Sequence, residues 1–336
     1  MSHTESSGRR PVAVVTGASG FVGKRLCEKL IDAGYEVRGL VAQETDASFL
    51  EGLGVALYRG RMRDADVVAA MMVGARVVFH LAGIVGRVGK LDAVYWDVNV
   101  TATKELLKAA TAAGVARFVH CSTADVHGDI VTPPADEEAP LAGQDIYQVT
   151  KEHAERAVLA SNGRGSLTTV VIRPSVVYGP RDLRRYPMFR AIAKQAYIII
   201  GDGTTTIHPL YIDDLVDGLL LAAVSGKAAG RVYLLAGERV VTHTGLATMV
   251  AAELKVPPSF IYRPAGPARF LSMVVEKLFF LFGMEPPLFR RTIEFFTKNR
   301  AYDIRRAVTE LGFAPKVTLE EGIHRTVAWY RERGLL

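Results

Sequence analysis

The feature that most constrains the fold is a regular alternation of short β-branched runs with amphipathic stretches over the first half of the chain. The apolar runs are typical of buried strands, and they cover residues 12–16, 37–41, 55–59, 77–82, 118–123 and 169–173. The stretches between them, such as 22–33 and 100–113, have helical spacing and stop near Gly34 and Gly114. Strict alternation of this kind predicts an α/β fold, a doubly wound parallel sheet with helices on both faces.

The alternation loosens after Pro180, where we expect a smaller C-terminal lobe to begin. A basic loop follows, then a strand at 197–200, a helix after Asp213-Asp214, a strand at 232–236 and several proline-rich joints. The length of 336 residues suits about two units of roughly 150 residues each. We therefore expect one domain over 11–180, to which 205–240 returns, and a lobe built from 181–204 and 241–330.

Composition argues against several classes of protein. The 41 lysines and arginines exceed the 35 acidic residues by only six, and they are spread along the chain, whereas a nucleic-acid binder gathers them. Cys27 and Cys121 form neither a disulfide framework nor a zinc-binding spacing, so we expect no metal site. The first ten residues are too polar for a secretory signal, and the apolar run 270–282 is shorter than the ~20 residues that cross a bilayer. We expect a cytoplasmic protein with no nucleic-acid partner.

A glycine-rich turn joins the first expected strand to the first expected helix. It contains Gly17, Ser19, Gly20, Phe21, Val22 and Gly23. Glycines there permit a tight turn and a close approach of the backbone to a pyrophosphate, which the N–H groups of the helix N-terminus then face. An ordinary strand–helix turn is the alternative, but the position of this turn, first in an alternating chain, favours a dinucleotide.

The residue that would contact the adenosine ribose should follow the second strand, and that position holds Ala42. This position holds neither a carboxylate, which would indicate NAD, nor an arginine, which would indicate NADP. Arg38, Arg61 and Arg63 are the nearest cations, although solvation at the surface explains them equally well. The choice between NAD and NADP stays open.

Tyr147 and Lys151 stand four residues apart, which places a phenol and an ammonium on one face of a helix. Such a pair is common by chance. Here the pair indicates a functional site, because it follows a strand that ends in Cys121-Ser122-Thr123 and the glycine turn lies upstream.

With these motifs together, the chain resembles the extended short-chain dehydrogenase/reductase family over nearly its whole length. The matching blocks are 16–23, 79–83, 99–100, 121–128, the Tyr147/Lys151 pair, 173–180 and 211–214. The resemblance implies a Rossmann-type sheet, a substrate-binding C-terminal lobe and a nicotinamide cofactor. It places Thr123 where the family has its catalytic serine, and it assigns further cofactor contacts to Leu81, Ala82, Gly83, Asn99, Lys151, Pro174 and Val176.

The expected chemistry agrees with these positions. A tyrosine has an ordinary pKa of about 10, and a neighbouring lysine ammonium favours the phenolate. Tyr147 is therefore expected to exchange a proton with the substrate oxygen as general base or acid, while Thr123 orients that oxygen. We interpret His80 as a core histidine and Asp213 and Asp214 as a helix N-cap pair. His127 is a candidate for the pocket wall, with a core position as the alternative.

The substrate class is less constrained. Nucleotide-sugar enzymes of the family often place a diphosphate-binding arginine shortly after a Gly-Asp-Gly turn, but after Gly201-Asp202-Gly203 that position is Ile207. The basic loop holds other candidates for such contacts, namely Arg181, Arg184, Arg185 and Arg190. The apolar run 270–282 is expected to be buried core or a subunit contact, a lid over the substrate, or a helix on a membrane surface.

The C-terminal third resembles the 3β-hydroxysteroid dehydrogenase branch. The leading hypothesis is therefore an NAD(P)-dependent alcohol dehydrogenase or ketoreductase that acts on a sterol-like or long-chain β-hydroxy or β-keto substrate. The alternatives are a nucleotide-sugar epimerase or dehydratase and, third, a non-catalytic dinucleotide-binding scaffold. Because family members often pair through helices like those that contain Val100 and Tyr147, we expect a homodimer.

Overall fold

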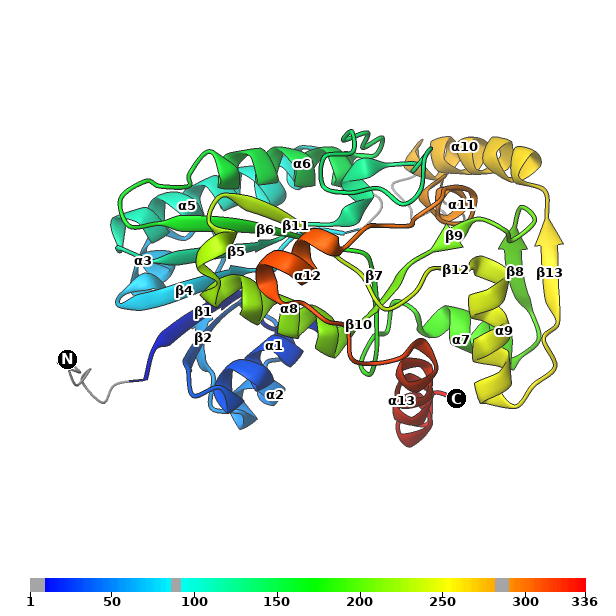
Figure 1. Ribbon diagram of the computed structural model, residues 1–336, viewed down its shortest axis with the longest axis horizontal. Helices are drawn as coiled ribbons and strands as arrows, with labels where there is room; N and C mark the ends of the chain where they lie inside the picture. Colours follow the sequence, from blue (N-terminus) through cyan, green and yellow to red (C-terminus); the bar gives the residue numbers. More distant parts are fainter. Residues whose placement is uncertain (1–9, 86–91, 282–289) are drawn as a thin grey trace.

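A seven-stranded parallel sheet forms the centre of the molecule (Figure 1). The computed structural model describes residues 10–85, 92–281 and 290–336. The strands lie in the spatial order β11-β6-β5-β4-β1-β2-β3, and every neighbouring pair is parallel. Their bounds are β1 (Val12–Thr16), β2 (Glu36–Val41), β3 (Ala56–Arg59), β4 (Ala75–His80), β5 (Arg117–Cys121), β6 (Thr168–Pro174) and β11 (Arg231–Leu235). The predicted doubly wound Rossmann-type sheet is confirmed.

Two strands end two residues earlier than the sequence predicts. β4 stops at His80 rather than at residue 82, and β5 stops at Cys121 rather than at residue 123. The backbone still makes one ladder-like bond in each case, from Leu81 N to Thr16 O and from Ser122 N to Ile172 O. The chain then leaves the sheet, so the last residues of both runs lie at its carboxyl edge instead of within it.

Helices cover both faces because alternate side chains of each strand point to opposite sides. Ala13 and Val15 pack with α1 (Phe21–Asp32) and α8 (Ile212–Val224) on one face. Val12 and Val14 pack with α3 (Ala65–Met72), α5 (Ala102–Ala112) and α6 (Ile146–Leu159) on the other. Short helical elements complete this half, namely α2 (Ser48–Gly52), α4 (Asp92–Tyr95), a π-helical turn (Trp96–Thr101) and 3₁₀ turns (Ala124–His127 and Gly226–Ala228).

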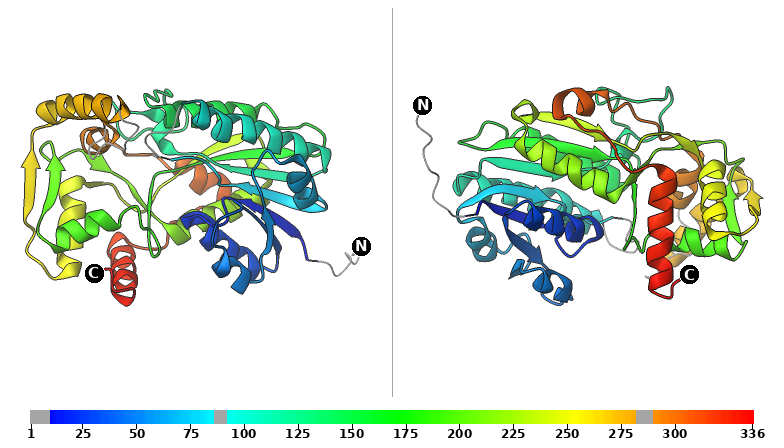
Figure 2. Two further views of the ribbon diagram at one scale, coloured as in Figure 1. Left: turned by 180° about the vertical axis from the view of Figure 1, so that it is seen from behind. Right: turned by 60° about the horizontal axis from the view of Figure 1, so that its bottom comes forward.

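The remaining strands form three small two-stranded sheets at one end of the central sheet (Figure 2). The pairs are β7 (Val176–Tyr178) with β10 (Pro209–Tyr211), β9 (Thr206–Ile207) with β12 (Val241–Thr242), and β8 (Tyr197–Ile200) with β13 (Phe260–Arg263). The helices here are α7 (Tyr186–Ala193), α9 (His243–Leu254), α10 (Ala265–Leu281), α11 (Arg290–Thr297) and α13 (Leu319–Glu332). α12 (Arg305–Leu311) instead packs beside β11 of the central sheet and beside α8 (Figure 1).

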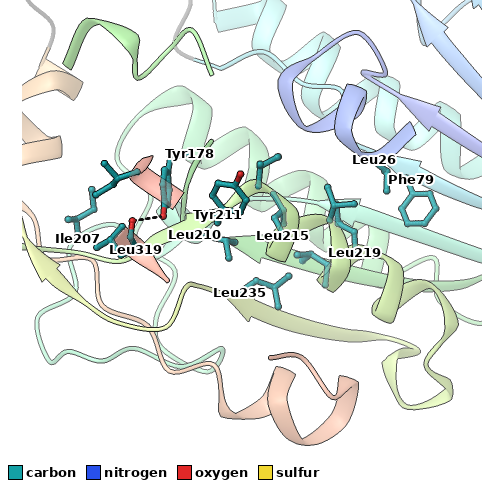
Figure 3. Close-up of a cluster of buried hydrophobic side chains, with 14 of the residues drawn as sticks. Leu26, Phe79, Tyr178, Ile207, Leu210, Tyr211, Leu215, Leu219, Leu235 and Leu319 are labelled. Carbon is teal, nitrogen blue, oxygen red and sulfur yellow. Dashed lines mark hydrogen bonds between the residues drawn. The ribbon is translucent and has the colours of Figure 1, made fainter. Parts of the chain in front are cut away.

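One apolar cluster is continuous from the sheet into this end of the molecule. Figure 3 shows it running from Leu26 and Phe79 beside the sheet, through Leu215 and Leu219 of α8, to Tyr178, Ile207 and Leu319. Burying such side chains is the main favourable contribution to folding. The two parts of the chain therefore share one core.

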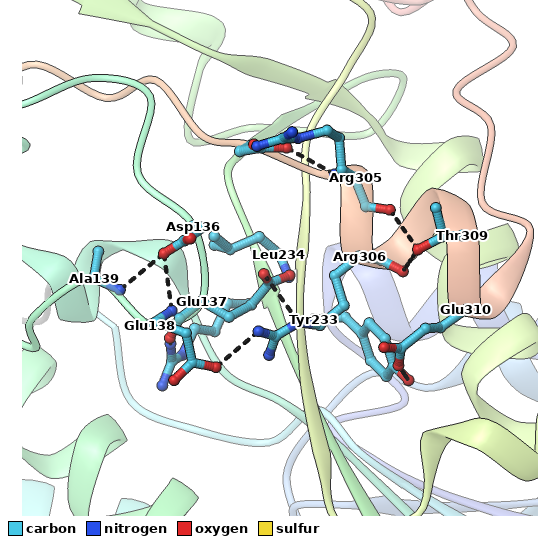
Figure 4. Close-up of polar contacts among 12 residues, drawn as sticks. Asp136, Glu137, Glu138, Ala139, Tyr233, Leu234, Arg305, Arg306, Thr309 and Glu310 are labelled. Carbon is cyan, nitrogen blue, oxygen red and sulfur yellow. Dashed lines mark hydrogen bonds and ion pairs between the residues drawn. The ribbon is translucent and has the colours of Figure 1, made fainter.

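A buried polar network joins the loop after β5 to β11 and α12 (Figure 4). The Glu137 carboxylate accepts a 2.8 Å hydrogen bond from Leu234 N, and its other oxygen lies 3.5 Å from Arg306 Nε. Tyr233 donates a 2.7 Å hydrogen bond to the Glu310 carboxylate. These contacts hold together segments that are 77 to 169 residues apart in sequence.

The structure corrects two interpretations. Asp213 and Asp214 are not helix N-caps, because α8 is capped by Tyr211; Asp213 instead pairs with Arg25, and Asp214 accepts from Lys316 N and Val317 N. Of the alternatives for 270–282, the buried core does not hold at Phe270 and Leu271, which are 67% and 54% exposed on α10. Residue 282 lies outside the described residues. No helix in the described part of the chain has the length and hydropathy to span a membrane.

Candidate active site

The glycine turn has the geometry of a phosphate cradle. Gly17 has a φ of +69°, which favours glycine, and a Cβ on Gly23 would stand 2.1 Å from Gly17 O. α1 begins at Phe21, its N-cap Gly20 supplies no capping side chain, and its first turn contains no acidic residue. The N–H groups at this helix end, at Phe21 and Val22, are therefore free to bind an anion, with Ser19 half-buried beside them. These residues fit the pyrophosphate of a dinucleotide.

The end of β4 forms the next wall. Ala82 N donates a 3.3 Å hydrogen bond to Thr16 Oγ1, and a Cβ on Gly17 would come within 2.9 Å of Ala82 N. The Asn99 side-chain amide accepts a hydrogen bond from Ile84 N and donates one to Ile84 O. It also donates a 3.0 Å hydrogen bond to Thr150 Oγ1. Asn99 thus fixes the backbone beyond Leu81 and Gly83 and ties it to α6.

The carboxyl end of β2 leaves one of the three candidate arginines available. Ala42 is exposed just after the strand, and Gly60 N donates to Val41 O, which brings Arg61 to this edge. Arg38 is bonded to Glu36 and to two backbone carbonyls, and Arg63 pairs with Asp97. The Arg61 side chain is exposed and is bonded to no other described residue.

Tyr147, Lys151 and Thr123 meet the same edge of the sheet from two elements. α6 begins with a capping box at Asp145 and Gln148, which fixes the helix start one residue before Tyr147. Lys151 Nζ donates a 2.8 Å hydrogen bond to Cys121 O, the last residue of β5, and Thr123 follows two residues later. All three side chains are buried, and burial lowers the pKa of the Lys151 ammonium. The face of α6 that carries Tyr147 and Lys151 is therefore held against Cys121, which directly precedes Ser122 and Thr123.

A second network that the sequence does not reveal lies beneath this site. His80 Nδ1 is 2.7 Å from Thr16 Oγ1, and His80 Nε2 is 2.8 Å from Thr103 Oγ1, which itself donates to Asn99 O. Because Thr103 donates elsewhere and Thr16 Oγ1 accepts from Ala82 N, the network assigns the His80 proton to Nε2. Burial lowers the pKa of His80 to about 3. His80 is a neutral core histidine, as expected.

His127 serves the core and is not among the residues that line the pocket described next. Its Nε2 accepts a 3.2 Å hydrogen bond from Arg173, and its Nδ1 lies 3.3 Å from Pro140 O. Arg173 in turn forms a buried 2.7 Å ion pair with Glu155 of α6. Burial, together with the adjacent Arg173 charge, lowers the pKa of His127 to about 4.

An almost wholly apolar pocket lies beside β7. It spans about 350 Å³, including the part open to solvent, and is lined by Val176, Tyr178, Arg185, Met188, Phe189, Ile207, Pro209, Leu246, Phe295 and Ile323. Val176 stands directly after Pro174-Ser175 at the end of β6. The lining comes from widely separated segments, and of these only Val176, Arg185 and Ile207 were singled out by sequence reasoning.

The basic loop divides between two parts of the molecule. Arg181 pairs with Glu28 and lies over the Phe49 ring, so it faces the sheet domain. Arg184 and Arg190 are exposed, and Arg185 lines the pocket. Across the described residues, no group of three or more histidine, cysteine or acidic side chains is placed to hold a metal ion.

Comparison with known proteins identifies the family. Residues 13–236 match the model of the NAD dependent epimerase/dehydratase family. The chain belongs to that family. Among curated relatives, the 2-alkyl-3-oxoalkanoate reductase of Stenotrophomonas maltophilia is 30% identical, covering 94% of this chain and 98% of its own. The 3 beta-hydroxysteroid dehydrogenase/Delta 5-->4-isomerase of Mycobacterium tuberculosis is also 30% identical, over 94% of this chain and 90% of its own.

Solved structures show the same fold. The crystal structure of gox2253 is 29% identical, with a TM-score of 0.82, and covers 97% of this chain and 100% of its own. The UDP-glucuronic acid 4-epimerase of Bacillus cereus, solved in complex with NAD, has a TM-score of 0.78 at 23% identity, covers 96% of this chain and 99% of its own, and shows the fold alone. The chain is an NAD(P)-dependent enzyme of the extended short-chain dehydrogenase/reductase superfamily, as predicted.

Proposed function

We propose that the chain is a ketoreductase or alcohol dehydrogenase that moves a hydride between a nicotinamide cofactor and a ketone or secondary alcohol with a large apolar part. The observation that carries this choice is the pocket beside β7, because its walls are apolar and include Ile207. A long-chain or sterol-like group is stabilised by such walls, whereas a diphosphate is not. The reductase and dehydrogenase names of the curated relatives support the same substrate class.

Tyr147 is the proposed proton donor and acceptor at the substrate oxygen, and Thr123 donates a second hydrogen bond to that oxygen. Lys151, held by Cys121 O, keeps a positive charge on the tyrosine face of α6 and favours the phenolate. The cofactor, when bound, supplies or accepts the hydride. We propose that the 17–23 turn holds its pyrophosphate, that Ala42 and Arg61 face its adenosine end, and that its nicotinamide end meets Leu81–Gly83, Asn99, Lys151, Pro174 and Val176.

Net change in reduced-cofactor absorbance tests the proposal. We expect sterols, long-chain 3-oxoalkanoates or their alcohols to change the absorbance of NADH or NADPH in step with turnover. The nucleotide-sugar epimerase alternative recycles its cofactor, so it predicts turnover of a UDP- or dTDP-sugar with no net change in absorbance. Thermal stabilisation by a UDP-sugar alone would refute the reductase proposal. Cofactor binding without turnover of any substrate class would favour the non-catalytic scaffold.

We also propose that 11–180, with 205–240 returning, forms the cofactor domain, and that 181–204 and 241–330 form the substrate lobe. The cytoplasmic location and the homodimer stay predictions. Light scattering tests the homodimer, and a monomer at micromolar concentration would exclude it.

The exposed apolar side of α10 is a proposed membrane-surface contact. Phe270, Leu271, Val274 and Leu278 are 39–67% exposed along one side of the helix. Exposed Arg263 and Arg269 stand nearby, which suits an anionic lipid surface. We expect the protein to sediment with anionic vesicles and a Phe270→Ser/Leu271→Ser variant to stay in the supernatant. Equal recovery of both proteins in the supernatant would contradict the contact.

A further inference from the structure

The apolar pocket contains one cation with no matching anion. Arg185 stands at the start of α7, and its guanidinium carbon lies 4.9 Å from the centre of the Phe295 ring. It is the single charged residue in the pocket wall. Among the residues that the structure describes, none forms an ion pair or a hydrogen bond with this guanidinium.

Two carboxylates, Asp125 and Asp182, favour the charged form of Arg185 without forming an ion pair with it. Asp125 accepts a 3.1 Å hydrogen bond from Arg300 Nε, and Asp182 accepts a 2.9 Å hydrogen bond from Arg184 N. Burial lowers the pKa of Arg185, while the charge of Asp182 only partly opposes that effect. Neither carboxylate bonds directly to the Arg185 guanidinium, so its N–H groups are available to an anion brought into the pocket.

Contiguous contacts link Arg185 to the proposed reaction site. Phe295 also lies under Arg300, 5.6 Å from its guanidinium carbon. Arg300 pairs with Asp125, whose backbone N–H donates a 3.2 Å hydrogen bond to Thr123 Oγ1. On another wall of the pocket stands Val176, which we place at the nicotinamide. A ligand in this pocket would therefore contact both Arg185 and Val176, the residue that we place at the nicotinamide.

We propose that Arg185 binds the carboxylate of an amphipathic substrate whose hydrocarbon part fills the pocket. This inference rests on the proposed function and narrows its substrate class to acids that carry the reacting ketone or alcohol. A single arginine matches one carboxylate, which it binds through two parallel N–H bonds. A pyrophosphate would bring a second charge against Ile207, Val176 and Phe295, where desolvation is unfavourable.

Binding measured without turnover tests this role. Octanoate and its neutral counterpart octanamide are titrated calorimetrically into the full chain loaded with NADP⁺. We expect octanoate to bind at least tenfold more tightly than octanamide. Arg185→Met should weaken octanoate binding about 10- to 100-fold, which is the contribution that hydrogen bonds to charged groups usually make to affinity. Octanamide binding should stay within twofold. Arg184→Met is the matched control and should change neither, because Arg184 is exposed outside the pocket wall.

Further variants keep the test decisive. Arg185→Lys retains the charge without the planar fork, so it should recover part of the octanoate affinity even if Arg185→Met folds poorly. Equal binding of acid and amide by the wild type would overturn the proposal, as would an equal loss of both in Arg185→Met. Binding of UDP-glucose that depends on Arg185 would assign the cation to a diphosphate instead. If octanoate binds through Arg185 but no ketone is reduced, the anion site stands and the proposed function fails.

Discussion

Tyr147 is the residue on which the proposed chemistry depends most directly. Lys151, one helical turn later, is buried, and its ammonium donates a hydrogen bond to the Cys121 carbonyl. This bond holds the ammonium in place when the Tyr147 phenol gains or loses its proton. We expect Tyr147→Phe to lower kcat by about 10²- to 10⁴-fold, the usual contribution of general acid–base catalysis. Cofactor fluorescence should show unchanged binding. Turnover within threefold of the wild type would remove Tyr147 from the reaction.

Arg61 gives a prediction about cofactor choice. It is the one unpaired cation beside the end of β2, near Ala42, among the described arginines Arg38, Arg61 and Arg63. We expect the enzyme to prefer NADP and Arg61→Ala to weaken NADPH about 10-fold or more, with NADH unchanged. Arg63→Ala is the control, because Arg63 pairs with Asp97. Fluorescence titration measures both affinities, and equal losses for the two cofactors would contradict a phosphate contact.

At this scale the sequence could predict the candidate residues but not the network beneath them. Tyr147 and Lys151 are found by local spacing, and Gly17 to Gly23 by a motif. Thr16 and His80 are 64 residues apart, and nothing in either neighbourhood indicates that their side chains bond. Leu246 and Phe295 are equally invisible as pocket residues, because any buried apolar side chain has the same sequence signal.

Among the elements, α1 depends on how closely it approaches the turn before it. A Cβ on Gly23 would meet Gly17 O at 2.1 Å and the Ala18 backbone at 2.8 Å, and backbone atoms cannot yield as a flexible side chain does. We expect Gly23→Ala to destabilise the protein by about 1–3 kcal/mol and to weaken cofactor binding. Gly52→Ala is the matched control in a helix with open space around it, and it should be neutral or slightly stabilising. Urea denaturation compares the two.

The buried ion pair between β6 and α6 is the next element-scale test. Arg173 donates to both oxygens of Glu155, so Glu155→Gln leaves a buried charge without its anion. We expect a loss of about 3–5 kcal/mol in the free energy of unfolding. The control pair is Arg156 with Glu152, whose arginine is 68% exposed; Glu152→Gln should cost less than about 1 kcal/mol. Similar losses for both would show that the Arg173 pair contributes little.

Elements of the first half were predictable because period-2 and period-3.6 patterns alternate there with glycine stops between them. The β7–β10 and β8–β13 pairs were not, since each strand is short and finds its partner more than 30 residues away. For α10 the sequence left burial and exposure open as alternatives. Its apolar composition suits either, and only the tertiary arrangement shows which side chains are left uncovered.

For the molecule as a whole, buried histidines predict a loss of stability in acid. Burial lowers the pKa of His80 to about 3 and those of His127 and His243 to about 4. Below pH 6.5 the unfolded chain binds protons at these histidines that the native state does not bind. Stability therefore falls as the pH drops from 6.5 to about 4 for His127 and His243, and to about 3 for His80. Each such histidine contributes about 2 kcal/mol of loss at pH 5.

A single variant isolates this effect, because the raised pKa values of Glu137, Asp182 and Asp214 act in the opposite direction. His243 packs against Phe295 and Phe296, and its Nε2 has no hydrogen-bond partner among the described residues. His243→Phe keeps this aromatic packing and removes one hydrogen bond to the Phe295 backbone. Between pH 7 and pH 5 the wild type should lose about 2 kcal/mol more than the variant in urea denaturation. Parallel pH profiles would show that His243 titrates normally.

The position of β11 in the sheet has a consequence for synthesis on the ribosome. β6 ends at Pro174, but its outer neighbour β11 ends at Leu235, after the chain has passed through α7, β8 and α8. At a translation rate of about 5–20 residues per second, the edge of β6 stays unpaired for roughly 3 to 12 seconds, until β11 has been synthesised. During that interval β6 presents an open, apolar strand edge, at which a nascent chain could associate with another copy.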